Sequence, residues 1–222
     1  MRPRSSRRTT KITKTTLYKT IFVSFVFFAI FVVRTFVAVA GAQVVPLASP
    51  HWPPNSAIRV WIDPANAPSG GVALVEKALQ TWTHAADGRF TLSRARTRDE
   101  AQITIKFVSS DTNYGETAPK VDAEKRFITS ADIGINAATP NDQVDARIVV
   151  YLTALHELGH ALGLPHTDSM RDIMYSFRAP DDGAKFFGNY RKLLTSVSDI
   201  GGPMATGLSP RDVSTLRALY DR

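Results

Sequence analysis

The chain has 222 residues, 44% of them hydrophobic, which is enough for one domain with a packed core but too few for two domains of ordinary size. Its net charge of +7 suggests nucleic-acid binding, yet eight of the 27 basic residues and none of the 20 acidic residues lie in residues 1–42. The remaining chain carries 19 basic against 20 acidic residues, so it offers no argument for a nucleic-acid partner. No cysteine is present, which excludes disulfide bonds and thiolate metal sites.

Residues 1–42 have the pattern of a secretory signal peptide. A basic segment rich in Ser and Thr precedes the mainly apolar run Ile21–Val33, and small residues suited to cleavage follow before residue 42. A membrane anchor is the alternative, because Ile21 to Ala40 could span a bilayer, but Arg34 interrupts it at a cost of about 2.5 to 3.5 kcal/mol near the bilayer centre. We therefore expect a cleaved leader and a secreted or extracellular product, periplasmic in a Gram-negative bacterium, with the membrane-anchored form as the alternative.

Residues 43–56 are too few to build a folded inhibitory domain, so we expect an extended N-terminal arm before a single domain at 57–222. Hydrophobic periodicity predicts a strand at 57–62, an amphipathic helix from 72 to about 85, and strands at 90–93 and 102–107. A helix between strands indicates a crossover connection and therefore a mainly parallel sheet.

Residues 109–125 are polar and precede a further strand, predicted at 127–136. Three acidic residues of this polar segment, Asp111, Glu116 and Asp122, could bind calcium. Their spacing is not that of a regular set of oxygen ligands, which favours solvated loop charges instead. Polar residues at 141–145 can then cap a long helix that continues to residue 156 and beyond.

Residues 156–166 read H-E-L-G-H-A-L-G-L-P-H and predict a metal site. His156 and His160 are four residues apart, so on a helix their imidazoles lie on one face and can bind the same ion. Gly163 can adopt the left-handed conformation that ends the helix, which would bring His166 round as the third ligand. Three imidazoles with one open position are typical of catalytic zinc, and Glu157 can take a proton from the zinc-bound water. An accidental H-E-x-x-H is the alternative, but the added Gly163 and His166 argue against it.

This segment resembles the motif of the metzincin clan of zinc peptidases, H-E-x-x-H-x-x-G-x-x-H followed by a methionine turn. Met174, in Asp172-Ile173-Met174-Tyr175, stands where that methionine would be and is expected to support the site from below without binding zinc. Within the clan the chain is most similar to the matrixins, the family of the matrix metalloproteinases, over about Ile58 to Tyr220. Tyr175 directly follows the methionine, whereas the tyrosine recruited in astacin-like relatives comes two residues after it, so we expect Tyr175 to have a packing role.

The resemblance implies an α+β fold with a twisted, mainly parallel five-stranded sheet, an antiparallel edge strand, two long helices and a C-terminal helix. The edge strand, expected within Gly115–Val121, would hold an extended substrate by backbone pairing. One catalytic zinc ion is implied and calcium is a further candidate. The structural zinc of the family is not expected, because its histidines are missing, and the absence of cysteine excludes the cysteine-based latency of many matrixins.

After Tyr175 the sequence departs from the vertebrate matrixin pattern, because Ser176-Phe177-Arg178 stands where Pro-x-Tyr usually follows the methionine turn. Residues 179–207 then form a long segment before the last helix. Phe186, Phe187 and Tyr190 in this segment could line the substrate pocket or simply cover the core. The last helix is predicted to begin after Ser209, with Ser209 as its cap and Asp212 at its third position. The resemblance implies that this helix docks against the methionine turn.

The predicted function is that of a secreted, monomeric zinc-dependent endopeptidase acting on protein or peptide substrates, with Glu157 as the general base. Two alternatives remain at this level. One is a membrane-anchored protease of the same chemistry, and the other is a zinc-binding module without catalysis, against which the presence of Glu157 argues.

Overall fold

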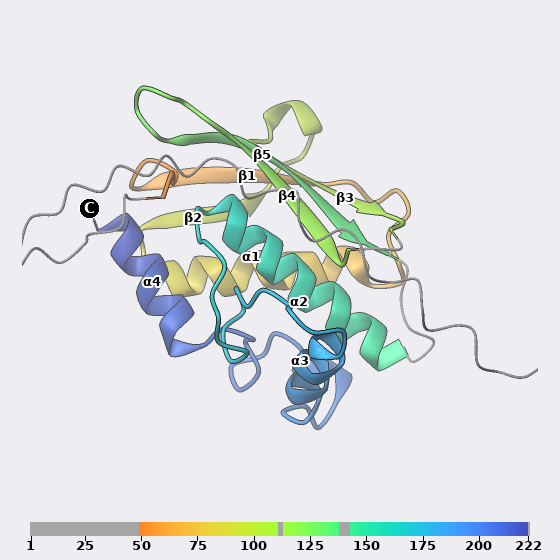
Figure 1. The fold of residues 1–222 in the computed structure, drawn as a ribbon. Helices are drawn as coiled ribbons and strands as arrows, with labels where there is room; N and C mark the ends of the chain where they lie inside the picture. The colour runs from red at the N-terminus through yellow and green to blue at the C-terminus, as the bar shows by residue number, and fades with distance from the viewer. Residues whose placement is uncertain (1–48, 111–112, 138–142, 222) are drawn as a thin grey trace, which may run out of the picture. The chain divides into compact units, whose positions relative to one another are not determined.

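The structure is a computed structural model that describes residues 49–110, 113–137 and 143–221. Its centre is a five-stranded sheet in the order β2-β1-β3-β5-β4, shown in Figure 1. All neighbouring strands are parallel except β4 and β5, which pair antiparallel at one edge. The strands are β1 (Ser56–Ile62), β2 (Phe90–Arg94), β3 (Ile103–Val108), β4 (Gly115–Val121) and β5 (Ile128–Asn136). The predicted mainly parallel sheet with an antiparallel edge strand is confirmed, and β4 has the predicted bounds.

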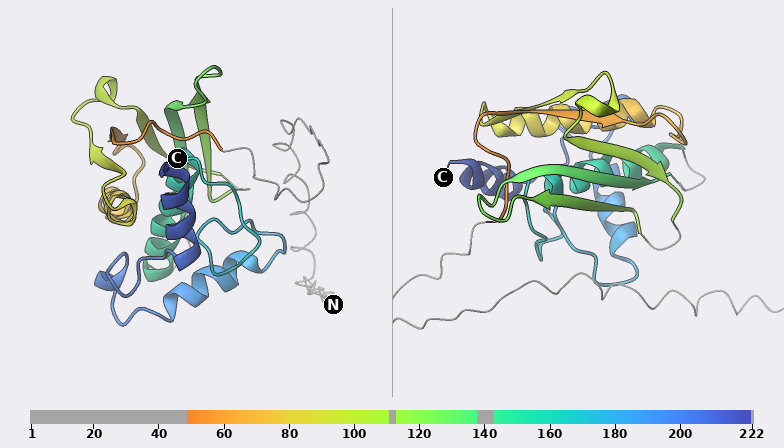
Figure 2. Two further views of the ribbon diagram at one scale, coloured as in Figure 1. Left: turned by 90° about the vertical axis from the view of Figure 1, so that its left-hand side faces the viewer. Right: turned by 90° about the horizontal axis from the view of Figure 1, so that it is seen from above.

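Two long helices, α1 (Gly71–Ala86) and α2 (Gln143–Ala161), cover one face of this sheet (Figures 1 and 2). The strands show why this face is covered: Ile58, Val60 and Ile62 alternate with more exposed residues and are themselves fully buried. The indole N–H of Trp82 on α1 donates to the carbonyl of Leu155 on α2 over 2.8 Å. The second helix, which carries the histidine motif, is therefore fixed to both the sheet and α1.

The segment 179–207 contains a helix, α3 (Asp182–Arg191), which the sequence analysis did not predict. Its first turn is held by the buried carboxylate of Asp182, which accepts hydrogen bonds from the backbone N–H groups of Arg178 and Ala179 at 2.7 and 2.9 Å. At its other end, Arg191 forms an ion pair with Asp145 on α2 at 2.6 Å. The long segment is therefore an ordered layer against α2.

The C-terminal helix, α4 (Pro210–Tyr220), begins as predicted. The Ser209 hydroxyl accepts from the N–H of Asp212 at 3.0 Å, and Oδ2 of Asp212 accepts from the N–H of Ser209 at 2.7 Å, which completes a capping box. Oδ2 of Asp212 also accepts from the backbone N–H of Ile173 at 2.9 Å. This contact joins α4 to the methionine turn, in agreement with the docking expected from the resemblance.

The described part of the N-terminal arm packs against the end of α2. The indole N–H of Trp52 donates to the carbonyl of Ala161 at 2.8 Å, and the hydroxyl of Tyr220 donates to the carbonyl of Leu162 at 3.0 Å. Both donors are buried and satisfy carbonyl groups that a helix end leaves without intrahelical partners. The arm and α4 therefore together hold the end of the helix that carries the motif. Trp52 is 109 residues from Ala161 in sequence, and Tyr220 is 58 residues from Leu162.

The predicted signal peptide at 1–42, with its anchor alternative, and the first residues of the predicted arm lie outside the described residues. In the part of the chain that the structure describes, none of the helices combines the length and the apolar character needed to cross a membrane.

Candidate metal centre

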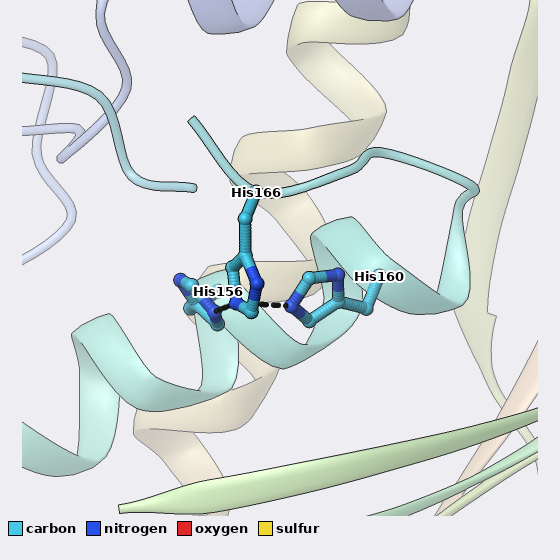
Figure 3. Close-up of side chains that lie close together, drawn as sticks. All are labelled: His156, His160 and His166. Atoms are coloured by element: carbon cyan, nitrogen blue, oxygen red, sulfur yellow. Dashed lines mark hydrogen bonds between the residues drawn. The ribbon is translucent and has the colours of Figure 1, made fainter. Parts of the chain in front are cut away.

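The three histidines of the motif converge on one point (Figure 3). His156 and His160 project from adjacent turns of α2, and His166 comes from the loop that follows the helix. Nε2 of His166 lies 3.3 Å from Nε2 of His156 and 3.0 Å from Nε2 of His160. Among the described residues these three form a group whose ligand atoms all lie within 4.8 Å of one another. The structure thus brings together the three predicted metal ligands.

Backbone carbonyls fix how two of the rings present their nitrogen atoms. Nδ1 of His156 lies 2.6 Å from the carbonyl oxygen of Ile173, and Nδ1 of His160 lies 2.9 Å from that of Leu164. A carbonyl oxygen only accepts, so each Nδ1 carries the hydrogen and each Nε2 directs a lone pair toward the centre of the group. Burial also lowers the pKa of His156 to about 4 and that of His160 to about 3, which keeps both rings neutral at physiological pH.

This arrangement fits a zinc ion. Nitrogen ligands about 2.0 to 2.1 Å from a tetrahedral ion are separated by about 3.3 Å, close to the two Nε2 separations seen here. Neutral imidazoles whose lone pairs face one another are a donor set for a cation, because without one they repel. His166 is exposed, so solvent reaches the group from the side of the third ligand. Three histidines with an accessible side match the donor set of a catalytic zinc site.

Gly163 makes the turn that the sequence predicts. The helix ends at Ala161, and Gly163 follows with φ of +97°, a conformation that only glycine adopts without strain. The N–H of Leu164 then bonds back to the carbonyl of Gly159 at 2.9 Å, closing the turn. Glycine also allows the chain to pass close to the N-terminal arm here. A Cβ at residue 163 would lie only 2.2 Å from the carbonyl oxygen of Pro50.

Met174 is buried against the helix that carries the first two histidines. A Cβ on Gly159 would lie 2.3 Å from Sδ of Met174, so the methionine packs directly on the helix between the first two histidines. The N–H of Thr167 donates to the carbonyl of Met174 at 2.8 Å, which ties the loop carrying His166 to the same turn. The sequence analysis missed Gly159, although a glycine in the middle of a helix was the signal that could have indicated a close approach.

Glu157 is buried beneath the edge strand β4. Its Oε2 lies 2.6 Å from the hydroxyl of Thr117. Burial raises the pKa of Glu157 to about 7, and the hydrogen bond from Thr117 opposes that rise. A zinc ion nearby would also favour the ionised carboxylate. The hydrogen bond from Thr117 and the ion would therefore both keep Glu157 able to accept a proton.

The predicted pocket residues separate into two places. Phe186 and Phe187 on α3 form an aromatic cluster with Phe177 and Tyr114, with ring centroids 5.0 to 6.0 Å apart in the contacting pairs. Tyr190, in contrast, is buried elsewhere: its hydroxyl donates to the carbonyl of Ala205 at 2.6 Å. Phe186 and Phe187 therefore lie beside the start of the edge strand, whereas Tyr190 holds the following loop.

Tyr175 and Asp182 connect this aromatic cluster to the methionine turn, a contact that the sequence analysis did not predict. The hydroxyl of Tyr175 donates to Oδ2 of Asp182 at 2.9 Å, which joins the methionine turn to α3. Its ring also contacts Phe177, with centroids 5.9 Å apart, in agreement with the predicted packing role.

Of the three calcium candidates, Asp122 has a role in local structure. Oδ1 of Asp122 accepts from the N–H groups of Glu124 and Lys125, both at 3.0 Å, and so shapes the turn between β4 and β5. Glu116 is exposed on β4, and Asp111 lies outside the described residues. The histidine group is the sole metal-ligand cluster found in the described ranges.

A mainly parallel sheet, a motif helix that ends in a glycine turn, three converging histidines and a methionine beneath them define a metzincin-type domain. The chain belongs to the matrixin family, whose model matches residues 69–187, more than half of the chain. Over 145 residues it is 28% identical to "Metalloendoproteinase 2-MMP" of Arabidopsis thaliana, covering 57% of this chain and 36% of that protein. Over 107 residues it is 28% identical to "Interstitial collagenase" of Oryctolagus cuniculus, covering 46% of this chain and 22% of that protein. The chain therefore matches well under half of the length of either relative.

Proposed function

We propose that this matrixin is a zinc-dependent endopeptidase that binds its substrate as an extended strand and uses Glu157 as the general base. The observation that carries the proposal is a buried carboxylate, Glu157, on the same helix as two of the three converging histidines, with its Oε2 2.6 Å from the hydroxyl of Thr117 on the edge strand β4. A zinc-binding module without catalysis would need the histidines but would have no use for a buried carboxylate at this position.

His156, His160 and His166 would hold the ion, which when bound supplies a Lewis acid that acidifies water and polarises the peptide carbonyl. Glu157 would accept the proton of the attacking water at Oε1, because its Oε2 is engaged by Thr117. The same carboxyl group would then release that proton to the leaving amine, so that Glu157 returns to its starting state. Burial helps, because it brings the pKa of Glu157 to about 7, near the operating pH of an enzyme that both takes and gives a proton.

The register of β4 defines where a substrate would pair. The N–H of Asn136 donates to the carbonyl of Tyr114 at 2.8 Å, so this opposite pair is hydrogen-bonded across the β4–β5 ladder. In an antiparallel ladder such pairs alternate, so the backbone groups of Gly115 and Thr117 point away from β5. No strand of the described residues lies on that side of β4. An extended peptide could therefore add to the sheet there by backbone pairing.

The expected location is outside the cell, on the basis of the leader pattern at residues 1–42. The relatives' names describe a metalloendoproteinase and a collagenase, but the chain covers a minor part of each. We therefore extend to this chain only the general class of substrate, a protein or peptide, and no particular one.

The proposal is tested with purified residues 43–222. We expect about one zinc ion per chain by elemental analysis and cleavage of unstructured peptides at neutral pH. A chelator should abolish the cleavage, and added zinc should restore it, because the ion is held by three neutral ligands and can be exchanged. Cleavage that persists after the zinc has been removed would contradict the proposal.

A second prediction concerns specificity. The wall formed by Phe177, Phe186 and Phe187 should favour Leu, Met or Phe just after the scissile bond, with each lost methylene costing about 1 to 3 kcal/mol of transition-state binding. A peptide library cleaved by the parent and by Phe186→Ala and Phe187→Ala should show this preference weakened in both variants. Tyr190→Ala, which removes a buried hydroxyl bonded to the loop, is a useful comparison for the remaining predicted pocket residue. If all three variants keep the parent's preference, the segment 179–207 only covers the core.

A further inference from the structure

Thr117 has two faces with different partners. Its side chain points toward α2, where its hydroxyl lies 2.6 Å from Oε2 of Glu157 and 2.9 Å from the backbone carbonyl oxygen of the same residue. Its backbone N–H and carbonyl point toward the free edge of β4, because Thr117 falls on the same alternation as Gly115. Thr117 therefore contacts the proposed general base through its side chain and forms part of the proposed substrate-binding edge through its backbone.

The close approach of β4 to α2 makes the contact with Glu157 possible. A Cβ on Gly115 would lie 2.7 Å from Cγ2 of Thr153 and 2.8 Å from Cγ of Glu157. A larger residue at position 115 would therefore push the strand away from the helix. With glycine there, the edge strand lies low enough for the Thr117 hydroxyl to reach the carboxylate 40 residues later in the chain.

The hydrogen bond from Thr117 engages Oε2 of Glu157 and does not engage Oε1. Thr117 has one hydroxyl hydrogen, and its nearest acceptor is Oε2 of the carboxylate, so Oε1 is the other atom that can accept a proton. The second acceptor at 2.9 Å, the carbonyl of Glu157, keeps the hydroxyl paired when the carboxyl group is protonated. Both states of the base therefore leave the half-buried hydroxyl with a partner, which avoids the cost of an unpaired polar group.

We propose that Thr117 is a positioning residue that fixes Oε2 of Glu157 and thereby orients Oε1 for proton transfer, while its own backbone pairs with the substrate. This inference rests on the proposed function of the site. It adds that alignment of the base depends on the strand that receives the substrate: a peptide bound along β4 pairs with the residue that holds Glu157. Thr117 acts through Glu157 and does not itself exchange a proton with the substrate.

The test compares two substitutions at residue 117 with a matched control. Thr117→Val keeps the shape of the side chain but removes the hydroxyl, and Thr117→Ser keeps the hydroxyl. Thr129→Val removes a threonine hydroxyl from β5, where it donates to the carbonyl of Lys120 at 3.2 Å, away from Glu157. Peptide hydrolysis is measured in the full chain for all three variants and the parent, together with zinc content and the unfolding temperature.

We expect Thr117→Val to lower kcat by about 10- to 100-fold, the loss expected when a hydrogen bond to a charged group is removed. KM and zinc content should stay near the parent values, because the backbone edge and the histidines are unchanged. Thr117→Ser should recover most of the lost kcat, and Thr129→Val should behave as the parent. This separation of kcat from KM, with rescue by the variant that retains the hydroxyl, is what a positioning role predicts and a packing role does not.

The inference is overturned if the parent hydrolyses peptides and Thr117→Val keeps the same kcat, which would leave the proposed function intact. It is also overturned if Thr117→Val unfolds or loses zinc, or if Thr117→Ser loses as much activity, because the role of the side chain would then be structural. A parent chain that binds zinc and cleaves no peptide would instead reject the proposed function, and this inference with it.

Discussion

Replacing Glu157 with alanine is expected to leave about one zinc ion per chain while lowering peptide hydrolysis by about 100- to 10,000-fold, the range for loss of a general acid–base group. The reason is that the three imidazoles converge without help from the carboxylate, whose partner is the Thr117 hydroxyl. The variant should also fold, because removing a buried carboxyl removes a group that is costly to ionise in the interior. Zinc content and kcat/KM, measured on the same preparation, check both parts of the expectation.

The control for this variant is Glu124→Ala, which removes an exposed carboxylate from the turn between β4 and β5. It should leave both zinc content and hydrolysis at parent values. Substantial turnover in Glu157→Ala would remove the assigned base and with it the mechanism. Loss of zinc from the variant would show that the carboxylate supports the ligands, a role that its position under β4 does not predict.

The sheet and the metal site could be predicted from the sequence because their determinants are local. Ile58, Val60 and Ile62 alternate along β1, and strict alternation has one simple structural meaning. The metal site is similarly local: its ligands span eleven consecutive residues, and helix geometry with one glycine turn determines how they converge. The resemblance supplied the antiparallel position of β4, which periodicity alone would not have given.

What the sequence did not reveal is mostly contact between distant segments. Thr117 lies 40 residues from Glu157 and Trp52 lies 109 residues from Ala161, and no spacing rule relates either pair. Helix α3 was missed for a different reason. It contains Gly183 and Gly188, residues of low helix propensity, so its stability comes from packing against α2 and from the contacts of Asp182.

The predicted pocket shows the same limit. The sequence alone groups Phe186 and Phe187 with Tyr190, because all three are large aromatic residues in one segment. In the structure both pack against Phe177 and Phe187 also packs against Tyr114, whereas the Tyr190 ring lies 6.1 Å from that of Tyr151. Composition could identify candidate residues, but only the path of α3 decides which of them lie beside the edge strand.

Replacing Gly163 with valine is expected to abolish zinc binding, although residue 163 contributes no ligand. Two effects act together. The residue has φ of +97°, which strains a β-branched side chain by about 1 to 3 kcal/mol. In addition, a Cβ would lie 2.2 Å from the carbonyl oxygen of Pro50, a backbone atom that cannot move aside as a flexible side chain would. The chain must therefore leave this path, and His166, three residues later, leaves the group.

The matched control is Gly88→Val, because Gly88 also has a positive φ, of +87°, but a Cβ there would meet nothing within 4 Å. It carries the backbone strain without the clash and far from the histidine motif in sequence. We expect Gly88→Val to lower the unfolding temperature while its zinc titration matches that of the parent, and Gly163→Val to lose zinc at concentrations that saturate the parent. A Gly163→Val variant that binds zinc like the parent would show that the turn can be remade with His166 in place. The position of the third ligand would then depend on Met174 and the Thr167 backbone contact beneath it, not on the conformation of residue 163.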